Sequence, residues 1–408
     1  MIPLWTALPF TLLLLSIAIL PMTVGHFWES HRNKGIVALG LSVPIIAWLI
    51  GHNPHELAHT LHEYFSFVVL LGALFTISGG IFLSGDLQAT PRVNSLFLAV
   101  GAILASLIGT TGASMVLIRP FLRTNSEREK TSHLPVFFIF VVSNCGGLLT
   151  PLGDPPLFLG YLRGVPFTWT LKLFPAWALV NALIILIFYA WDQKAYSKET
   201  KKALQKDRTH VVAIQIHGWK NLLFLGGVIY GVFLSSPHRE VMMLLMTLFS
   251  YFLGSKTARH QNHFSWGPII EIAVLFAGIF VTMVPALMLL KAHGPSFGIT
   301  KPWQFFWLTG SLSSFLDNAP TYVTLLSLAQ GLGLAGEVVG VPEKILAAIS
   351  TGAVFMGASS YIGNGPNFMV KAIADHAGFK TPSFFGYMGY AAIILLPIFF
   401  AVTLIFFR

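Results

Sequence analysis

The sequence S-N-C-G-G-L-L-T-P-L-G-D-P-P-L-F-L-G, residues 143–160, interrupts a strongly apolar part of the chain. It contains four glycines and three prolines, together with Asn144 and Asp154. Glycine and proline disfavour the interior of a helix, and an ionisable group at membrane depth is costly. The stretch therefore predicts a membrane helix that is broken, with a carboxylate placed at the break.

The composition indicates a polytopic membrane protein. Of the 408 residues, 55% are hydrophobic and only 10% are charged, whereas soluble domains carry about 25% charged residues. The first apolar run, 4–20, lacks the basic start and small-residue cleavage site of a signal peptide, so we expect it to span the membrane. The single cysteine, Cys145, excludes an intrachain disulfide. We attribute the net charge of +9 to membrane loops and expect no nucleic-acid partner.

Two apolar segments, 94–118 and 303–330, are interrupted at 109–112 (G-T-T-G) and 317–320 (D-N-A-P). We interpret both as re-entrant hairpins, which enter and leave the membrane on the same side. The remaining apolar runs predict spanning helices, since each approaches the bilayer-spanning length of about 20 residues. The predicted spans are 4–24, 36–50, 63–83, 134–160, 173–191, 219–235, 240–254, 266–290, 345–370 and 383–407.

The distribution of basic residues agrees with this arrangement. If both hairpins are re-entrant and the N-terminus is outside, eighteen of the 25 Lys and Arg residues fall in inner loops and seven in outer loops. Inner loops of membrane proteins carry an excess of Lys and Arg. The bias predicts that the N-terminus is outside. We expect a multi-pass protein of a prokaryotic cytoplasmic membrane.

The chain also contains an internal repeat. Residues 106–118 align with 314–326, and 153–158 align with 363–368, at offsets of 208 and 210 residues. Each half holds five spans and one hairpin, and an odd number of spans places the second half upside down. We expect an all-α protein with a first inverted repeat at 1–191, a solvated cytoplasmic linker at 192–218 and a second repeat at 219–408. Inverted repeats with broken helices are typical of secondary transporters.

The four interruptions are expected to converge on one site, because backbone groups freed inside a membrane need partners. Two of them carry a carboxylate, and none contains Lys or Arg. Hard cations such as sodium prefer oxygen ligands. The candidate ligands are Asp154, Asp317, Asn144, Asn318, Asn364, Asn367, Ser143, Thr110, Thr111, Ser114 and Thr321.

Structural alternatives remain for several of these residues. Asp154 and Asp317 each precede a helix-starting proline pattern and could serve as helix caps. Thr110, Thr111 and Ser114 could bond only to carbonyls of their own helix.

The sequence H-E-L-A-H at 55–59 matches the zinc-protease motif H-E-x-x-H. The residues that follow belong to a predicted span and offer no third ligand, so we expect neither a zinc site nor an enzyme. We interpret it as an amphipathic stretch at the outer interface. Because histidine titrates near neutral pH, His52, His55, His59 and His62 could alternatively sense pH.

Four motifs resemble the ion transporter superfamily, in particular NhaD-type sodium/proton antiporters and the related citrate transporter group. The matching stretches are G-T-T-G-A-S-M-V-L-I-R-P at 109–120, S-N-C-G-G-L-L-T-P-L-G-D-P-P-L-F at 143–158, L-D-N-A-P-T-Y at 316–322 and Y-I-G-N-G-P-N-F-M-V at 361–370. The resemblance implies an elevator-type homodimer. Its first three and its sixth to eighth spans would form the scaffold, and the remaining elements would form a moving transport domain.

We predict the exchange of Na⁺, or Li⁺, for H⁺, with Asp154 and Asp317 binding the two ions in turn and with no other cofactor. Sodium-coupled carboxylate symporters of this superfamily carry Ser-Asn-Thr at both hairpin tips, and this chain does not. Cation-coupled symport of citrate or another organic anion is the alternative.

Overall fold

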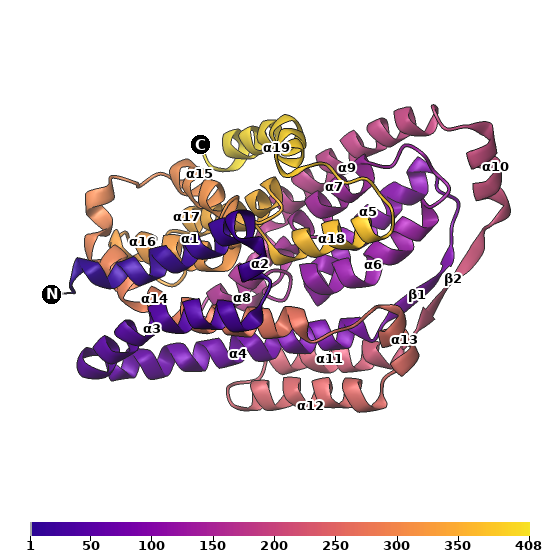
Figure 1. Ribbon diagram of the computed structural model, residues 1–408. Coiled ribbons are helices and arrows are strands. Elements are labelled where there is room, and N and C mark those ends of the chain that lie inside the picture. Colours follow the sequence, from indigo (N-terminus) through magenta and orange to yellow (C-terminus); the bar gives the residue numbers. More distant parts are fainter. Residues whose placement is uncertain (1) are drawn as a thin grey trace.

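The computed structural model describes residues 2–408 and is mostly helical (Figure 1). Within these residues, seven helical segments are long and apolar enough to cross a membrane. They are Leu4–Pro21, His31–His52, Pro54–Gly79, Pro91–Ile108, Phe167–Tyr196, Gly267–Phe297 and Phe384–Phe406. The chain is therefore a polytopic membrane protein.

Each unbroken span that the sequence predicted coincides with one main helix. Two of these helices, α11 and α12, are 13 and 16 residues long, below the bilayer-spanning length of about 20. The unbroken helices and their short flanking helices are η1 (Leu4–Ala7), α1 (Leu8–Thr23), α2 (Gly25–Trp28), α3 (His31–His52), α4 (Pro54–Gly79), η3 (Phe167–Leu173), α9 (Phe174–Tyr196), α11 (Lys220–Val232), α12 (His238–Leu253), α14 (Gly267–His293), η4 (Gly294–Phe297) and α19 (Phe384–Phe406).

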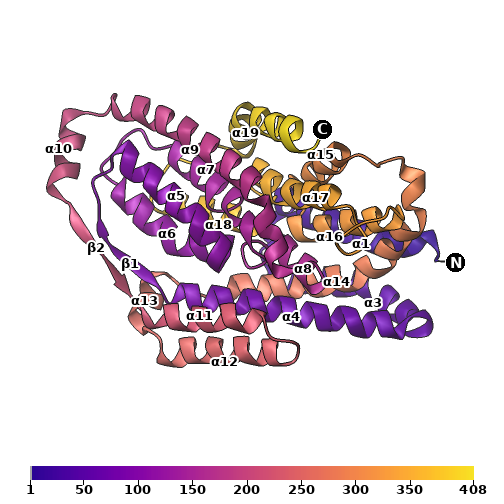
Figure 2. The same ribbon diagram turned by 180° about the vertical axis from the view of Figure 1, so that it is seen from behind.

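The two interrupted segments are helical hairpins. In the first, α5 (Pro91–Ile108) packs against α6 (Thr110–Thr124); in the second, α15 (Pro302–Ser313) packs against α16 (Asn318–Gly331). The first tip turns at Gly109, whose φ of +81° lies in the region that favours glycine. The hairpins occupy opposite halves of the long axis of the molecule (Figures 1 and 2). α5 is apolar enough to span a membrane, but it is one arm of a hairpin.

The two predicted broken helices are interrupted as expected. The first consists of α7 (His133–Val141), the 3-10 helix η2 (Cys145–Leu149) and α8 (Pro155–Leu162). The second consists of α17 (Glu343–Met356), the 3-10 helix η5 (Gly357–Ser359) and α18 (Gly365–His376). Proline at the start of α8 and α18 suits the first helical turn, where its missing N–H is not needed.

The broken helices make matching contacts with their hairpins. Thr150 donates its hydroxyl to the carbonyl of Ser106, and Ser360 donates its hydroxyl to the carbonyl of Ser314. These pairs are related by the same offsets, 208 and 210 residues, as the sequence repeat. The two halves therefore share a local architecture at their hydrogen bonds as well as in their sequence.

A two-stranded antiparallel ribbon, β1 (Phe82–Asp86) with β2 (Val212–His217), was not predicted. The predicted span 63–83 thus ends at Gly79, where α4 stops. The Asn262 side chain holds the ribbon base by donating to the carbonyls of Gly79 and Ile81 at 3.0 and 2.6 Å. At its other end, Arg123 of the first hairpin donates to the carbonyl of Gly85 at 3.0 Å.

The linker 192–218, predicted as a solvated connector, is mostly exposed but is anchored at a few buried residues. It begins inside α9 and contains α10 (Lys201–Thr209) and β2. Outside the linker, α13 (Lys256–Gln261) lies near β1. Three of its carboxylates, Asp192, Glu199 and Asp207, are buried. Their partners lie in the 89–133 region; for example, Asp207 accepts from the backbone N–H of Ala89 at 2.9 Å. These bonds tie the linker to the start of the first hairpin and to the segment that follows it.

Close backbone approach at both breaks predicts that two glycines are irreplaceable. A Cβ at Gly153 would lie 2.1 Å from the carbonyl oxygen of Gly147, and a Cβ at Gly363 would lie 2.5 Å from that of Gly357. Rigid backbone cannot yield easily, so Gly153→Ala and Gly363→Ala should each destabilise the protein by about 1–3 kcal/mol. Thermal unfolding in detergent, monitored by size-exclusion chromatography of the protein that stays folded, measures this decrease in stability.

The matched control is Gly40→Ala, because a Cβ there meets nothing within 4 Å. Its unfolding temperature should equal or exceed that of the wild type. Equal unfolding temperatures for all three variants and the wild type would contradict the tight packing of the breaks.

Candidate functional site

The buried carboxylate of Asp154 is the centre of the site. Its Oδ1 accepts from the Thr110 hydroxyl at 2.8 Å and from Asn364 Nδ2 at 3.2 Å, and its Oδ2 accepts from Asn318 Nδ2. Asp154 is 1% exposed. It occupies the N-cap position of α8, but its side chain makes no capping bond. The capping interpretation is therefore wrong for Asp154, which instead joins both hairpin tips to both broken helices.

Three asparagines link the two broken helices directly. Asn144 Nδ2 donates to Asn367 Oδ1 at 2.6 Å, and Asn364 Nδ2 lies 3.3 Å from Asn144 Oδ1. Asn367 in turn donates to the backbone carbonyls of Gly357 and Ser360, both at 2.9 Å. These side chains supply partners for carbonyls that the helix break leaves free.

Two hydroxyls join the first hairpin to the first break. Ser114 Oγ and Ser143 Oγ form a buried hydrogen bond of 2.9 Å. The Ser143 carbonyl also accepts from Asn364 at 3.1 Å. Because Thr110 and Ser114 bond across to other segments, the interpretation that they only bond to their own helix is wrong for both.

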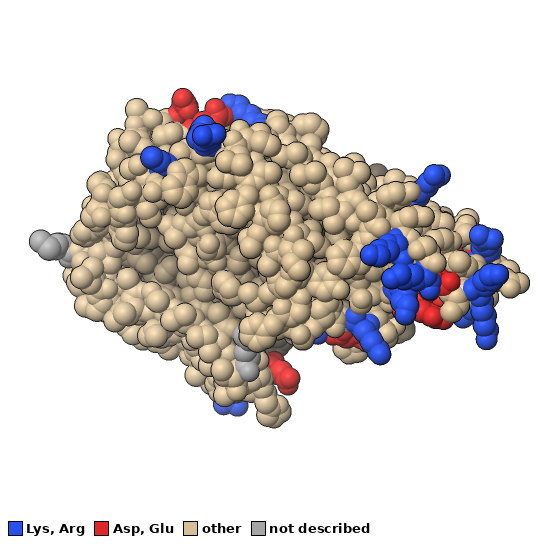
Figure 3. Space-filling view, turned by 90° about the horizontal axis from the view of Figure 1, so that it is seen from above, with Lys and Arg blue, Asp and Glu red and all other residues tan. Residues whose placement is uncertain are grey.

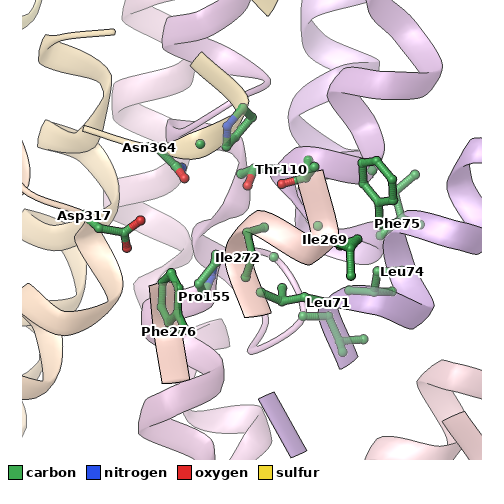
Figure 4. A pocket seen from close by; sticks show the side chains of 18 residues that line it. Leu71, Leu74, Phe75, Thr110, Pro155, Ile269, Ile272, Phe276, Asp317 and Asn364 are labelled. Carbon is green, nitrogen blue, oxygen red and sulfur yellow. The ribbon is translucent and has the colours of Figure 1, made fainter. Parts of the chain in front are cut away.

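Asp317 has a different role. Its carboxylate caps α16 by accepting from the N–H of Ala319 at 3.0 Å, as the alternative interpretation allowed. It also lines the cavity shown in Figure 4. Thr321 bonds to its own helix, to the Asp317 carbonyl at 2.9 Å, and does not line this cavity.

The cavity has a volume of about 70 Å³ and two unlike walls. One wall comes from the hairpin tips and the broken helices. It carries the polar side chains of Thr110, Thr111, Asp317 and Asn364 among apolar residues such as Leu152 and Pro155. Figure 4 shows Thr110, Asp317 and Asn364 on this side. Asp154 lies behind this wall. The other wall is apolar and comes from α4 and α14; the sequence did not single out its residues. They are Leu71, Leu74, Phe75, Ile269, Ile272 and Phe276.

The charge and hydrogen bonding of the site favour a positively charged ligand. None of the residues that line the cavity is Lys or Arg. Asn318 Oδ1 is buried and has no hydrogen-bond partner within residues 2–408. A buried acceptor without a partner is unusual in folded proteins and suits a cation or a donor that arrives later.

Other polar residues singled out in the sequence lie outside the site. The residues 55–59 lie on the first turns of α4. There His59 Nδ1 is 3.8 Å from Glu63 Oε1, and His62 Nε2 is 3.0 Å from Ser236 Oγ. Within the described residues, no group of three or more metal-binding side chains comes together. The structure thus places His59 and His62 in pairwise contacts in the first part of α4.

Comparison with known families identifies the class of protein. A family model described as "Putative citrate transport" matches residues 1–407. The chain belongs to this family, and it is therefore a membrane transporter. The match agrees with the citrate transporter group of the resemblance and does not single out the sodium/proton antiporters. A search of curated proteins gave no match.

The cross-segment bond of Thr110 predicts a measurable difference between two threonines. Thr110→Val removes a donor to a buried carboxylate, which should lower the unfolding free energy by about 1.5–3 kcal/mol. Thr321→Val makes the same chemical change in the other hairpin, where the hydroxyl bonds only to its own helix. Thermal unfolding of both variants in detergent should show the larger decrease for Thr110→Val. Equal decreases would mean that the Asp154 contact has no special weight.

Proposed function

We propose that the protein exchanges sodium, or lithium, for protons across the cytoplasmic membrane of a prokaryote. The observation that carries the proposal is the small cavity lined by Asp317 and backed by Asp154, with no Lys or Arg on its walls. Its volume of about 70 Å³ suits a small ion. A site with two carboxylates attracts cations and repels free polyanions.

Exchange requires that the two ions exclude each other. Sodium needs ionised oxygen ligands, while a proton occupies the same carboxylate oxygens. Asp154 and Asp317 are the carboxylates that bind the proton and the sodium ion in turn. Asn318, whose Oδ1 has no partner within residues 2–408, offers a further ligand. Asn144, Asn364 and Asn367 hold the broken helices around them. Loading sodium thus expels protons from the site.

The transport step is an elevator movement of inverted repeats. The hairpins, α7–α9 and α17–α19 would move against a scaffold of α1, α3, α4, α11, α12 and α14. The apolar wall from α4 and α14 supports this movement. Apolar side chains do not bind an ion, so they would not hold the site back as it moves past them. The opposite placement of the hairpins (Figures 1 and 2) and their matching contacts support the inverted repeat.

The proposal also includes the orientation of the protein in the membrane and its assembly. Lys and Arg gather at the end of the molecule that carries α10 (Figure 3), which we assign to the cytoplasm by the excess of basic residues in inner loops. The N-terminus then lies outside. The scaffold helices expose large hydrophobic side chains, such as Leu223 of α11 and Phe252 of α12. We assign these to the lipid bilayer and to a second copy in a homodimer.

Cation-coupled uptake of citrate or another organic anion is the second candidate, because the family description names citrate. The N-termini of α8 and α18, at Asp154 and Asn364, would have to attract the anion, since helix N-termini carry a partial positive charge. The carboxylates of Asp154 and Asp317 oppose such binding.

Proteoliposomes containing a pH-sensitive dye and an imposed pH gradient separate the candidates. Sodium or lithium should collapse the gradient in the wild type. Because either substitution removes a proton-carrying group, Asp154→Asn and Asp317→Asn should each reduce this rate at least about a hundredfold, within the range for loss of a proton-transfer group. Asp375→Asn, an exposed carboxylate near the end of α18, is the matched control and should retain the wild-type rate.

Size-exclusion chromatography verifies that each variant is folded. Full exchange in both site variants would contradict the mechanism. Uptake of labelled citrate driven by a cation gradient, without collapse of the pH gradient by sodium, would replace it with the second candidate.

Cross-linking tests the elevator movement. Arg163, after α8, and Glu63 of α4 form an ion pair of 3.0 Å between the two proposed domains. In a Cys145→Ala background, Glu63→Cys with Arg163→Cys, joined by a short bifunctional maleimide, should stop transport because it ties the domains together. Lys172→Cys with Glu343→Cys is the control, since this 2.6 Å pair lies within the proposed transport domain. Equal transport by both cross-linked proteins would exclude the movement.

A further inference from the structure

A second cavity, of about 950 Å³, lies away from the ion site at the end of the molecule where basic residues gather (Figure 3). Its walls come from the 128–133 segment that leads into α7, from the C-terminal part of α9 and from the segment after α18. A volume near 1,000 Å³ is enough for a ligand much larger than an inorganic ion. Five of the lining residues are Lys or Arg, namely Arg128, Lys130, Lys194, Lys198 and Lys380.

The four lysines of this cavity have no acidic partners. Across residues 2–408, none of them lies within 4.0 Å of a carboxylate. Glu129 is the one acidic residue among the lining residues. Arg128 is paired with Asp192 and Glu199, so the excess positive charge of the cavity comes from its four lysines. Such a concentration of like charge attracts an anion.

Arg128 borders the cavity, but its side chain is buried, at 1% exposed, and is held by two carboxylates. Its Nη1 donates to Asp192 Oδ1 at 2.7 Å, and its Nε lies 3.4 Å from Glu199 Oε1. These bonds fix the guanidinium, and the residue is only 6% exposed. Its Nη2 is buried and has no partner in the part of the chain that the structure describes. Because this guanidinium is buried and paired, the lysines of the cavity are the groups that face an incoming anion.

One side of the cavity is apolar. Ile187, Ala190 and Trp191 line it from the membrane helix α9. Trp191 is 41% exposed and packs on the ring of Tyr390 of α19, with ring centroids 5.5 Å apart. Trp and Tyr favour the headgroup level of a bilayer. The cavity thus combines cations with an apolar surface at membrane depth, a combination suited to an amphiphile.

We propose that this cavity binds the phosphate group of an anionic phospholipid from the inner leaflet, with an acyl chain along Ile187 and Trp191. Basic pockets between membrane helices on the cytoplasmic side are typical sites for such headgroups. A free phosphate ion shares the anionic chemistry, but it would leave the apolar side of the cavity empty. The inference rests on the proposed orientation of the molecule, but it does not depend on which ions the transporter carries.

Lipid counting by native mass spectrometry tests the proposal. Delipidated protein in detergent is titrated with phosphatidylglycerol, with phosphatidylcholine and with inorganic phosphate. The wild type should bind one phosphatidylglycerol preferentially. The variant with Lys130, Lys194, Lys198 and Lys380 each changed to Gln should bind it at least about tenfold more weakly, since each basic residue near an anionic headgroup adds to its attraction.

The matched control changes four other exposed lysines, Lys201, Lys202, Lys220 and Lys256, to Gln. It carries the same change in net charge outside the cavity and should bind like the wild type. Arg128 is left intact because it also holds Asp192 and Glu199. Size-exclusion profiles verify the fold of both variants.

Three results would overturn the proposal. The first is equal weakening in both variants, which would indicate bulk electrostatics. The second is unchanged binding in the cavity variant. The third is binding of inorganic phosphate that the cavity lysines control, without preferential binding of phosphatidylglycerol, which would assign the cavity to a free ion.

Discussion

The buried carboxyl group of Asp154 has to find all its hydrogen-bond donors within the protein, because lipid offers none. Asp154 finds them on Thr110, Asn318 and Asn364, which are far apart in the sequence. Each of these donors belongs to a different interrupted segment. A single carboxylate thereby fixes both hairpin tips against both broken helices, and the cavity beside it exists because those segments meet there.

The two halves contribute to this centre unequally. Thr110 and Asn318 are equivalent positions, 208 residues apart, and both donate to Asp154. The counterpart of Asp154 itself is Asn364, a donor rather than an acid. The second carboxylate, Asp317, corresponds to Gly109 at the first tip. The repeat thus provides symmetric scaffolding, while substitution at two corresponding pairs creates one central acid and one that faces the cavity.

The sequence revealed those features whose causes are local. Clustered glycine and proline predict the breaks at 143–160 and at the hairpin tips, and oxygen-bearing side chains there predict the polar centre. It could not show that Asp154 bridges segments while Asp317 caps a helix, because the partners of Asp154 are distant in sequence. Leu71 and Phe276 of the apolar wall look like any membrane-helix residues. The β1–β2 ribbon escaped detection because its strands are short and all of β2 is exposed.

The ribbon also has a mechanical meaning. β1 connects α4 to the first hairpin, and β2 connects α10 to α11, so both chain crossings between the proposed domains at this end are hydrogen-bonded to each other. Two separate connectors would move independently, whereas two hydrogen-bonded strands bend together as one unit of fixed length. No described strand pairs with the short connection from α14 to α15 at the opposite end. The movement of the proposed transport domain would therefore be restricted at the end with the ribbon and less restricted at the other end. This difference favours a tilting movement over pure translation.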